Sequence, residues 1–225
     1  MEYEVEEIIE ETSFYAPSVH DVLDINRQYD QLMYVHEAAI QLVVARLNIL
    51  KGEFRFSNDR NPIASISSRI KSRESILLKM EKKRLPMTIS AMRAHIHDIA
   101  GVRVVCPFIE DVYYVARMLT RQKIIELVTV KDYIREPKPN GYRSLHLIIN
   151  VTVDFAEATR VVPVEIQIRT IAMDFWASAE HQLRYKKDRF LSLEENAKLK
   201  ECADLMAEAD KKMQEVAGEF DTEMW

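Results

Sequence analysis

Residues 144–153 have the sequence SLHLIINVTV, and residues 161–170 have the sequence VVPVEIQIRT. Both segments are compact and rich in Val and Ile, a composition that favours β-strands. Two further segments of this kind come before them, GVRVVCPF at 101–108 and LVTVKDYI at 127–134. We therefore predict that the middle of the chain forms a β-sheet.

Segments with helical periodicity surround these strands. They predict helices over 19–51, 110–122, 170–187 and 193–220, and a short helix from Ser90 to near His97. Pro62, which the first turn of a helix tolerates, predicts a further helix from Asn61 to about Lys83. The last helix is predicted to be amphipathic through Ala197, Cys202, Leu205, Ala209, Met213 and Val216. This order predicts an α+β fold: a mixed β-sheet of about five strands flanked by helices, with helical extensions at both ends.

The composition limits the class of protein. A chain of 225 residues that is 48 % hydrophobic can bury one core, or one core and an arm. No apolar run reaches the roughly 18–20 residues that span a bilayer, so no membrane is expected. The first residues, MEYEVEEIIEE, are acidic, unlike a secretory signal. Cys106 and Cys202 are expected to be buried thiols in a reducing compartment, so we predict a cytoplasmic protein.

Charge is distributed unevenly along the chain. Residues 60–103 contain ten Lys or Arg and three Asp or Glu. Residues 1–30 contain nine acids and one Arg, and residues 188–225 contain eleven acids and five bases. A basic centre between acidic ends suits a small polyanion in a pocket. It suits a long nucleic acid less well, because the acidic flanks would repel its phosphate backbone.

The segment KDYIREPKPNGYRSLH at 131–146 is poor core material but suits a bound nucleotide. Its cations, Lys131, Arg135, Lys138 and Arg143, surround two prolines and the Asn140-Gly141 turn signal. The chain has only four glycines and no Gly-rich phosphate loop, so phosphates would be held by side-chain cations. Tyr142 is expected at the loop tip, where stacking on a base is worth about 1–3 kcal/mol and needs only the ring. The alternative is a Tyr over the sheet edge, beside a His146 that is an ordinary strand residue.

Two carboxylates are candidates for a metal site. Asp98 directly precedes one predicted strand, and Glu165 lies within another, so they could meet across adjacent strands and share Mg²⁺. Alternatively, Asp98 is a turn residue and Glu165 pairs with Arg103 or Arg169. Arg103 interrupts an apolar strand, which normally indicates a cleft or a carboxylate partner. A run of Arg69, Lys71, Arg73 and Lys79 is, in the ordinary case, a solvated basic helix face.

Other classes of protein fit less well. His20-Asp21 and His97-Asp98 suggest an HD-type metal phosphohydrolase, but that site needs more His and Asp ligands in an all-helical bundle. A nucleotidyltransferase acting on RNA or a sugar would show a Gly-Ser pair followed by Asp-x-Asp, and the chain has none. A non-catalytic regulator would be indicated by loss of a metal carboxylate, and both are present.

Three long motifs resemble the synthetase domain of the Rel/Spo family. They are HIHDIAGVRVVC (95–106), VKDYIREPKPNGYRSLHL (130–147) and EIQIRTIAMDFWASAEH (165–181), and SRIKSRESI (68–76) fits the same pattern. The resemblance covers roughly residues 60–187. With no hydrolase or regulatory domain beside it, the chain resembles a stand-alone small alarmone synthetase. This implies a nucleotidyltransferase-like α+β synthetase fold. It also implies transfer of pyrophosphate from ATP to the ribose 3′-OH of GDP or GTP, giving ppGpp or pppGpp and AMP in the stringent response.

The resemblance also implies a role for each matching residue. Asp98 and Glu165 would be catalytic and hold Mg²⁺. The basic residues that would bind ATP are Arg69, Lys71, Lys79 and Arg103. The residues that would bind GTP or GDP are Lys131, Lys138, Asn140, Tyr142 and His146, with Glu180 receiving the guanine N1–H and N2–H₂. The chain departs from the family at Thr129, where an Arg often stands, and this leaves the preference between GDP and GTP open.

Finally, the resemblance implies a division of the chain. Residues 1–59 would be an N-terminal helical extension, residues 60–187 the synthetase core, and residues 188–225 a C-terminal helix for oligomerisation. Small members of the family form tetramers, so a homotetramer is expected. The partners implied are ATP and GTP or GDP, with no membrane and no nucleic acid required for activity.

Overall fold

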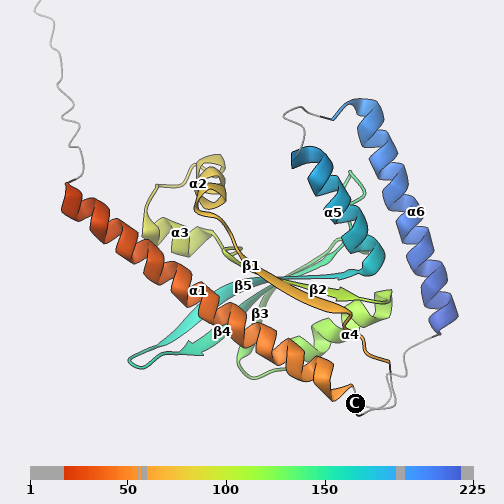
Figure 1. Cartoon of the computed structure of the whole chain (residues 1–225), viewed down its shortest axis with the longest axis horizontal. Helices are drawn as coiled ribbons and strands as arrows, with labels where there is room; N and C mark the ends of the chain where they lie inside the picture. Colours follow the sequence, from red (N-terminus) through yellow and green to blue (C-terminus); the bar gives the residue numbers. More distant parts are fainter. Residues whose placement is uncertain (1–17, 55, 57–59, 186–190, 219–225) are drawn as a thin grey trace, which may run out of the picture.

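The computed structural model describes residues 18–54, 56, 60–185 and 191–218. Its helices and strands are shown in Figure 1. In chain order they are α1 (Val19–Glu53), β1 (Ser65–Ile70), α2 (Arg73–Lys82), α3 (Ile89–His95), β2 (Ala100–Cys106), α4 (Ile109–Thr120), β3 (Ile125–Asp132), β4 (Leu145–Asp154), β5 (Thr159–Thr170), α5 (Ile171–Tyr185) and α6 (Leu193–Ala217).

The strands form one five-stranded sheet in the order β1-β2-β5-β4-β3. Neighbouring strands are antiparallel except β2 and β5, which run parallel. The sheet is therefore mixed, and the predicted α+β architecture is confirmed. Its central strand, β5, is the last strand in the sequence.

One face of the sheet is apolar because side chains alternate along each strand. On β5 the even-numbered residues from Val162 to Ile168 are buried, and on β4 the odd-numbered residues from Leu145 to Val153. Helices α1 and α4 cover this face and complete the core, with Val43 of α1 and Val115 of α4 both buried in it. The opposite face is thus left to polar side chains.

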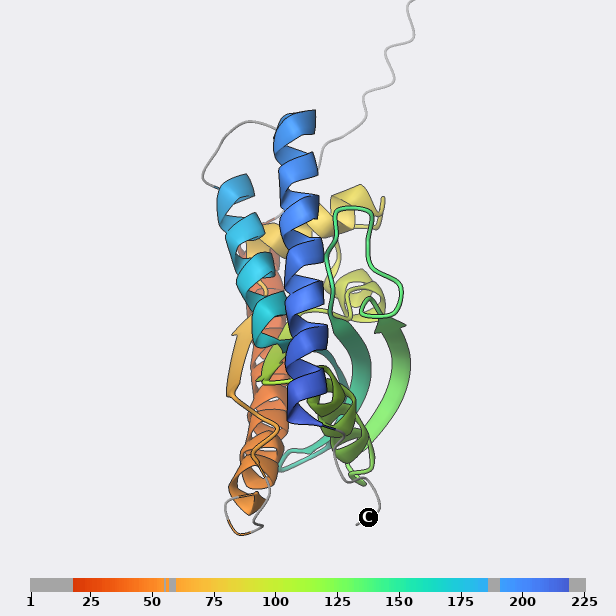
Figure 2. The same cartoon turned by 90° about the vertical axis from the view of Figure 1, so that its right-hand side faces the viewer.

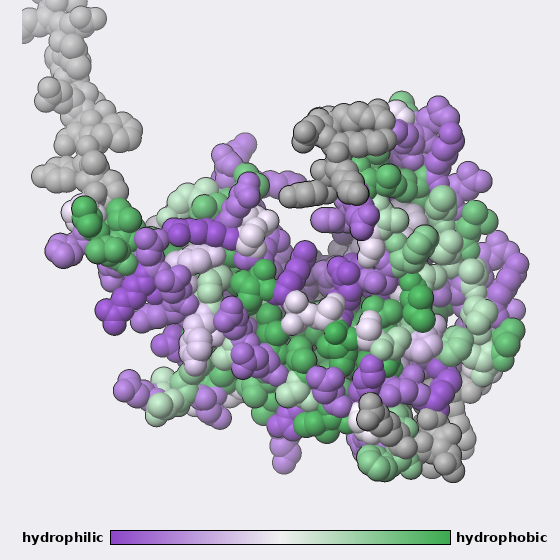
Figure 3. Space-filling view, in the orientation of Figure 1, coloured by the Kyte–Doolittle hydropathy of each residue, from purple (hydrophilic) through white to green (hydrophobic). Residues whose placement is uncertain are grey.

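The opposite face lies between two helical pairs, α2 with α3 and α5 with α6 (Figures 1 and 2). Hydrophilic side chains line the hollow between them in the space-filling view (Figure 3). None of the helices in the described ranges combines length with enough apolar residues to cross a bilayer.

The helix predicted from Asn61 to Lys83 is wrong in its first half. Residues 65–70 form β1, which pairs antiparallel with β2, and α2 begins only after the N-cap Ser72. The Asn61 side chain accepts a hydrogen bond from the Ile63 N–H, 3.0 Å, so Asn61-Pro62 forms a turn and does not start a helix. β1 is a mostly exposed edge strand, and pairing with β2 determines its conformation more than local periodicity does.

The apolar stripe of α6 does not pack against the protein. The helix instead packs through a second set of residues, Leu199, Ala203, Met206 and Asp210. Leu205 and Met213 are more than half exposed, and Val216 is 83 % exposed. Cys202 is exposed as well, so the expectation of two buried thiols holds only for Cys106.

Candidate functional site

The polar face of the sheet arranges its side chains in rows across the strands. In one row Arg69 of β1, Gly101 of β2 and Glu165 of β5 are in register. In the adjacent row the aligned residues are Ser67, Arg103, Gln167, His146 and Lys131. A cavity of about 140 Å³ lies over these rows and is lined by Arg69, Asp98, Arg103, Glu165 and Gln167, among others. The strand register thus brings together residues far apart in the sequence.

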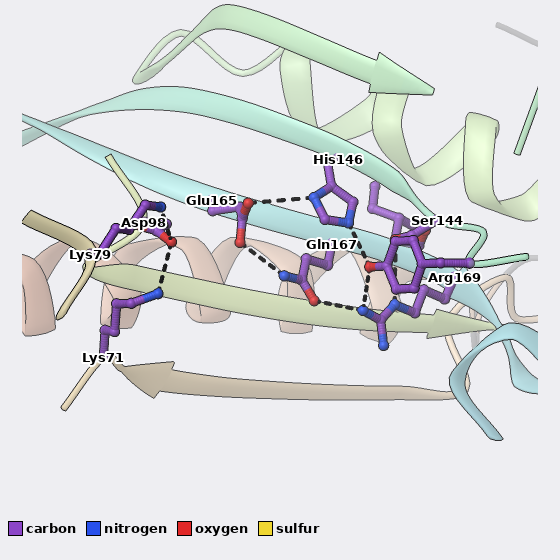
Figure 4. A network of polar contacts seen from close by, with 10 residues as sticks. Lys71, Lys79, Asp98, Ser144, His146, Glu165, Gln167 and Arg169 are labelled. Carbon is purple, nitrogen blue, oxygen red and sulfur yellow. Dashed lines mark hydrogen bonds and ion pairs between the residues drawn. The ribbon is translucent and has the colours of Figure 1, made fainter. Parts of the chain in front are cut away.

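Asp98 lies at one end of the cavity and is held by two lysines (Figure 4). Its Oδ2 atom accepts hydrogen bonds from Lys71 Nζ at 3.0 Å and from Lys79 Nζ at 2.6 Å. Burial alone would raise the pKa of the Asp98 carboxyl, but the bonds from Lys79 and Lys71 outweigh it and lower the pKa. The Oδ1 atom is buried and has no hydrogen-bond partner among the described residues. Asp98 is therefore an ionised carboxylate with one oxygen, Oδ1, that accepts no hydrogen bond from the described residues.

Glu165 lies in the same cavity on the central strand. Its Oε2 atom accepts a hydrogen bond from Gln167 Nε2 at 2.8 Å, and its Oε1 atom is 3.4 Å from His146 Nδ1. Burial would raise the pKa of the Glu165 carboxyl, but these two contacts outweigh it and lower the pKa. The charge of Asp98 acts on this pKa in the opposite direction, because the two carboxylates are neighbours. Their predicted juxtaposition is thus present.

The alternative ion pairs considered for Glu165 are not formed. Arg103 and Arg169 both contact Asp174 of α5 instead, at 3.2 and 3.3 Å. Arg103 still lines the cavity, as expected for a cation that interrupts an apolar strand. Asp174 had not been predicted, because nothing in its local sequence indicates that the helix after β5 brings it to Arg103 and Arg169.

The loop before β4 provides an aromatic surface. The Tyr142 ring centroid lies 6.0 Å from that of Tyr133 and 5.8 Å from that of His146. Lys138 Nζ is 4.7 Å from the Tyr142 centroid. Tyr142 is partly buried, and its hydroxyl oxygen is 2.7 Å from His146 Nε2. The structure therefore brings Lys138, Tyr142 and His146 together.

The other residues predicted for the acceptor nucleotide lie around this loop. Asn140 Oδ1 accepts a hydrogen bond from the Tyr142 N–H at 3.2 Å, and Asn140 Nδ2 is 3.5 Å from Glu180 Oε1 on α5. Glu180 also pairs with Arg184 one turn along the helix. Lys131 is exposed on β3 and aligned with His146. These predicted residues thus lie near the aromatic surface.

Helix α6 holds the same loop from outside, which sequence reasoning missed. Arg143 donates hydrogen bonds to the Ala203 carbonyl at 3.1 Å and to Asp204 Oδ1 at 3.2 Å. Trp176 of α5 donates to the Leu199 carbonyl at 2.8 Å. Gly141 has a φ of 88°, and a Cβ added there would lie 2.5 Å from the Ala203 Cβ. Arg143, predicted as one of the loop's phosphate-facing cations, is therefore tied to the C-terminal helix.

Comparisons with known proteins agree with this geometry. Residues 68–189 match the family model described as a region found in RelA/SpoT proteins. The chain is 41 % identical over 201 residues to the GTP pyrophosphokinase YwaC of Bacillus subtilis, covering 89 % of this chain and 96 % of the relative.

Solved structures give the same result. Small alarmone synthetase 1 of Bacillus subtilis bound to its product pppGpp superposes with a TM-score of 0.80 at 32 % identity, covering 87 % of this chain and 99 % of that one. The same synthetase bound to AMPCPP gives a TM-score of 0.74 at 29 % identity, covering 85 % and 97 %. The predicted family and fold are confirmed, and the chain belongs to the RelA/SpoT family.

Proposed function

We propose that this chain is a GTP pyrophosphokinase that synthesises alarmones. It transfers the β,γ-pyrophosphate of ATP to the ribose 3′-OH of GDP or GTP and releases AMP. The observation that carries the proposal is the pair Asp98 and Glu165, which share one cavity with Arg69 and Arg103. His146 connects Glu165 to Tyr142 of the aromatic loop. The curated relative at 41 % identity bears the name of this enzyme class.

The donor ATP is assigned to the basic side of the cavity. Arg69 and Arg103 line it, and Lys71 and Lys79 converge on Asp98 at its end. Two arginines in the cavity and two lysines bonded to Asp98 suit a triphosphate, and a planar guanidinium is also able to stack on adenine. The related synthetase bound to AMPCPP, an ATP analogue, supports a nucleoside triphosphate as one substrate.

The acceptor GDP or GTP is assigned to the aromatic side. Tyr142 would stack on guanine, and Glu180 would receive the N1–H and N2–H₂ donors of the base. Lys131, Lys138, Asn140 and His146 would complete this pocket. Its location beside Glu165 supports the assignment, because the acceptor hydroxyl must reach the catalytic carboxylate.

Mg²⁺ is the metal that these residues fit. The Asp98 Oδ1 atom is buried and has no partner among the described residues, and Glu165 supplies a second hard oxygen in the same cavity. No group of three or more His, Cys, Asp or Glu that could hold a metal occurs within the described ranges. Two carboxylates suit Mg²⁺, which takes its remaining ligands from water and phosphate. When bound, it would neutralise phosphate charge during transfer.

The protein's own residues would then complete the reaction. Glu165, whose lowered pKa keeps it ionised at neutral pH, would accept the proton of the 3′-OH as its oxygen attacks the β-phosphorus. The bond from that phosphorus to the bridging oxygen of AMP breaks, and AMP leaves with its negative charge. Lys71 and Lys79 would hold the donor phosphates in line.

The assembly and the division of the chain belong to the same proposal. We keep residues 60–187 as the catalytic core and 1–59 and 188–225 as its N- and C-terminal extensions. Within the described residues the first extension contains α1, which packs on the sheet, and the second contains α6. We also propose a cytoplasmic homotetramer. The apolar residues that α6 leaves uncovered, Leu205, Met213 and Val216, support a further packing partner for this helix. Sedimentation at several protein concentrations, with charged substitutions at Leu205 and Met213, would test it.

One assay tests the reaction. The protein is incubated with Mg²⁺, ATP labelled on the γ-phosphate, and either GDP or GTP. The proposal requires label on the guanine nucleotide and an equal amount of AMP, because both outer phosphates move together. Release of ADP and labelled phosphate would identify an ATPase instead. Comparison of kcat/KM for the two acceptors would resolve the preference that Thr129 leaves open, and we expect GDP to be preferred.

A further inference from the structure

Five side chains join the aromatic surface to the catalytic carboxylate in a closed ring of polar contacts (Figure 4). Arg169 Nη2 donates to the Tyr142 hydroxyl oxygen at 2.6 Å, and that hydroxyl is 2.7 Å from His146 Nε2. His146 Nδ1 is 3.4 Å from Glu165 Oε1. On the other side, Arg169 Nη2 donates to Gln167 Oε1 at 2.9 Å, and Gln167 Nε2 donates to Glu165 Oε2 at 2.8 Å. Two arms thus connect one guanidinium to both oxygens of one carboxylate.

Donors and acceptors can be assigned consistently around this cycle of hydrogen bonds. The Tyr142 oxygen already accepts from Arg169, so its single O–H is free to donate to His146 Nε2. With Nε2 accepting from Tyr142, His146 carries a hydrogen on Nδ1 and donates a hydrogen bond from it to Glu165 Oε1. Gln167 accepts with its oxygen and donates with its nitrogen. Every bond therefore runs from Arg169 toward Glu165, and such chains strengthen each member bond by polarisation.

Arg169 is well placed to organise this cycle of polar contacts because its own side chain is held in place by its neighbours. Its side chain is only 5 % exposed, and it pairs with Asp174 at 3.3 Å. Its Nε atom lies 3.4 Å from the buried Ser144 hydroxyl. The guanidinium carbon also lies 5.1 Å from the Tyr142 ring centroid. Arg169 therefore holds both the aromatic ring and the hydroxyl of Tyr142 in place.

We infer that Arg169 and Gln167 are positioning residues for Glu165, and that the Tyr142 hydroxyl is a working part of this link. The inference rests on the proposed function and deepens it. Tyr142 would have two separable tasks: its ring holds the acceptor base, and its hydroxyl orients Glu165 toward the acceptor 3′-OH. The stacking role predicted from the sequence needs only the ring, which phenylalanine would also supply, so the hydroxyl role is an addition to that prediction.

The test separates these tasks by measuring kcat and acceptor KM for two variants and their combination. Tyr142→Phe keeps the stacking surface and cuts one arm, and Gln167→Met keeps the side-chain length and cuts the other. Each is expected to lower kcat about tenfold, because a hydrogen bond to a charged group is lost. Acceptor KM should change less than about twofold. The double variant should lose about 100-fold or more in kcat, because neither arm then holds the carboxylate.

The matched control is Tyr34→Phe on α1. Tyr34 is 61 % exposed, lies against Phe155 away from the cavity, and its hydroxyl takes part in no side-chain hydrogen bond among the residues that the structure describes. It should behave as the wild type. Binding of GDP in the absence of ATP, together with thermal melting of each variant, shows whether the acceptor pocket and the fold persist.

The outcomes separate the inference from the proposed function. If the wild-type protein makes no labelled guanine nucleotide, the proposed function and the positioning role are both wrong. If the wild type is active and Tyr142→Phe and Gln167→Met keep its kcat, the positioning role is overturned and the proposed function stands. A rise in acceptor KM with unchanged kcat also overturns it, because the hydroxyl would then act in binding. A fall in kcat with unchanged GDP affinity supports it.

Discussion

Replacing Gly141 by alanine should damage the acceptor site through the C-terminal helix. The added Cβ would lie 2.5 Å from the Ala203 Cβ and 3.0 Å from Lys200 Cδ. The lysine is able to move, but the alanine is fixed on α6. Overpacking of this kind costs about 1–3 kcal/mol. The φ of 88° adds about 1–2 kcal/mol for a residue with a side chain. The total is roughly 2–5 kcal/mol.

This cost must appear in one of two measurable places. If α6 stays docked, the free energy of unfolding falls by that amount in urea titrations. If the loop moves to relieve the contact, acceptor KM rises instead, and about 2 kcal/mol corresponds to roughly a 30-fold change. In either case the KM for ATP should change little, because the donor residues lie across the cavity.

Two companion variants sharpen the test. Gly52→Ala is the control, because a Cβ there meets no atom within 4 Å and φ is not positive, so stability should hold or rise slightly. Ala203→Gly, combined with Gly141→Ala, removes the colliding methyl and should recover the overpacking part of the loss. Unchanged stability together with unchanged acceptor KM in Gly141→Ala would refute the reasoning.

Three further predictions follow from the site and its supports. Asp98→Asn and Glu165→Gln should each lower turnover at least about 1000-fold in the labelled-ATP assay, since an amide is a poor Mg²⁺ ligand and no base; near-normal product from either would contradict the assignment. Lys79→Met should raise the KM for ATP about tenfold and leave acceptor KM unchanged, because it removes a cation from the donor side; an effect on the acceptor alone would show that the pockets are exchanged. Burial raises the pKa of Asp210 above its ordinary 3.8, so its ionisation costs stability as pH rises through the folded-state value. Asp210→Asn keeps an acceptor for Thr170 and should be at least as stable as the wild type at pH 7.5, with the difference shrinking toward pH 4; a difference that grows on acidification would reverse this sign.

Much of the fold follows from local pattern. The β-branched segments at 101–108 and 161–170 are β2 and β5, and the helical periodicity at 19–51 is α1. The predictions from local sequence were wrong where contacts between distant segments determine the structure, as in β1 and α6. Strand β1 is short, polar and paired only at the sheet edge, so its sequence carries no strong period of two. In α6, the face that packs holds Ala203 and Asp210, and its apolar stripe is exposed.

The site was predictable in part for a similar reason. Asp98 and Glu165 could be paired from sequence because each lies at or in a strand of the same sheet. The positions of Gln167 and Arg169 also carry a signal, since they alternate with Ile166 and Ile168 and so share a face with Glu165. The bonds of Arg169 to Tyr142 and Ser144 depend in addition on the Tyr142 loop, which the register of β4 with β5 brings to Arg169.

The position of β5 at the centre of the sheet has a consequence for how the protein becomes active during folding. Strands β3, β4 and β5 can pair in sequence order as one unit and β1 and β2 as another, but the two units meet only when β5 pairs with β2. Glu165 and its neighbours on β5 are among the last strand residues to be synthesised. The pairing of β5 with β2 joins residues far apart in the sequence, such as Ala100 and Val164, and contacts of this kind form late and slowly. Before β5 pairs with β2, Asp98 and Glu165 therefore belong to separate units. A nascent or partly folded chain contains one side of the cleft or the other, but not a complete site. Activity should appear in a single step with the native sheet, and refolding followed by turnover and by β-sheet signal should give the same rate.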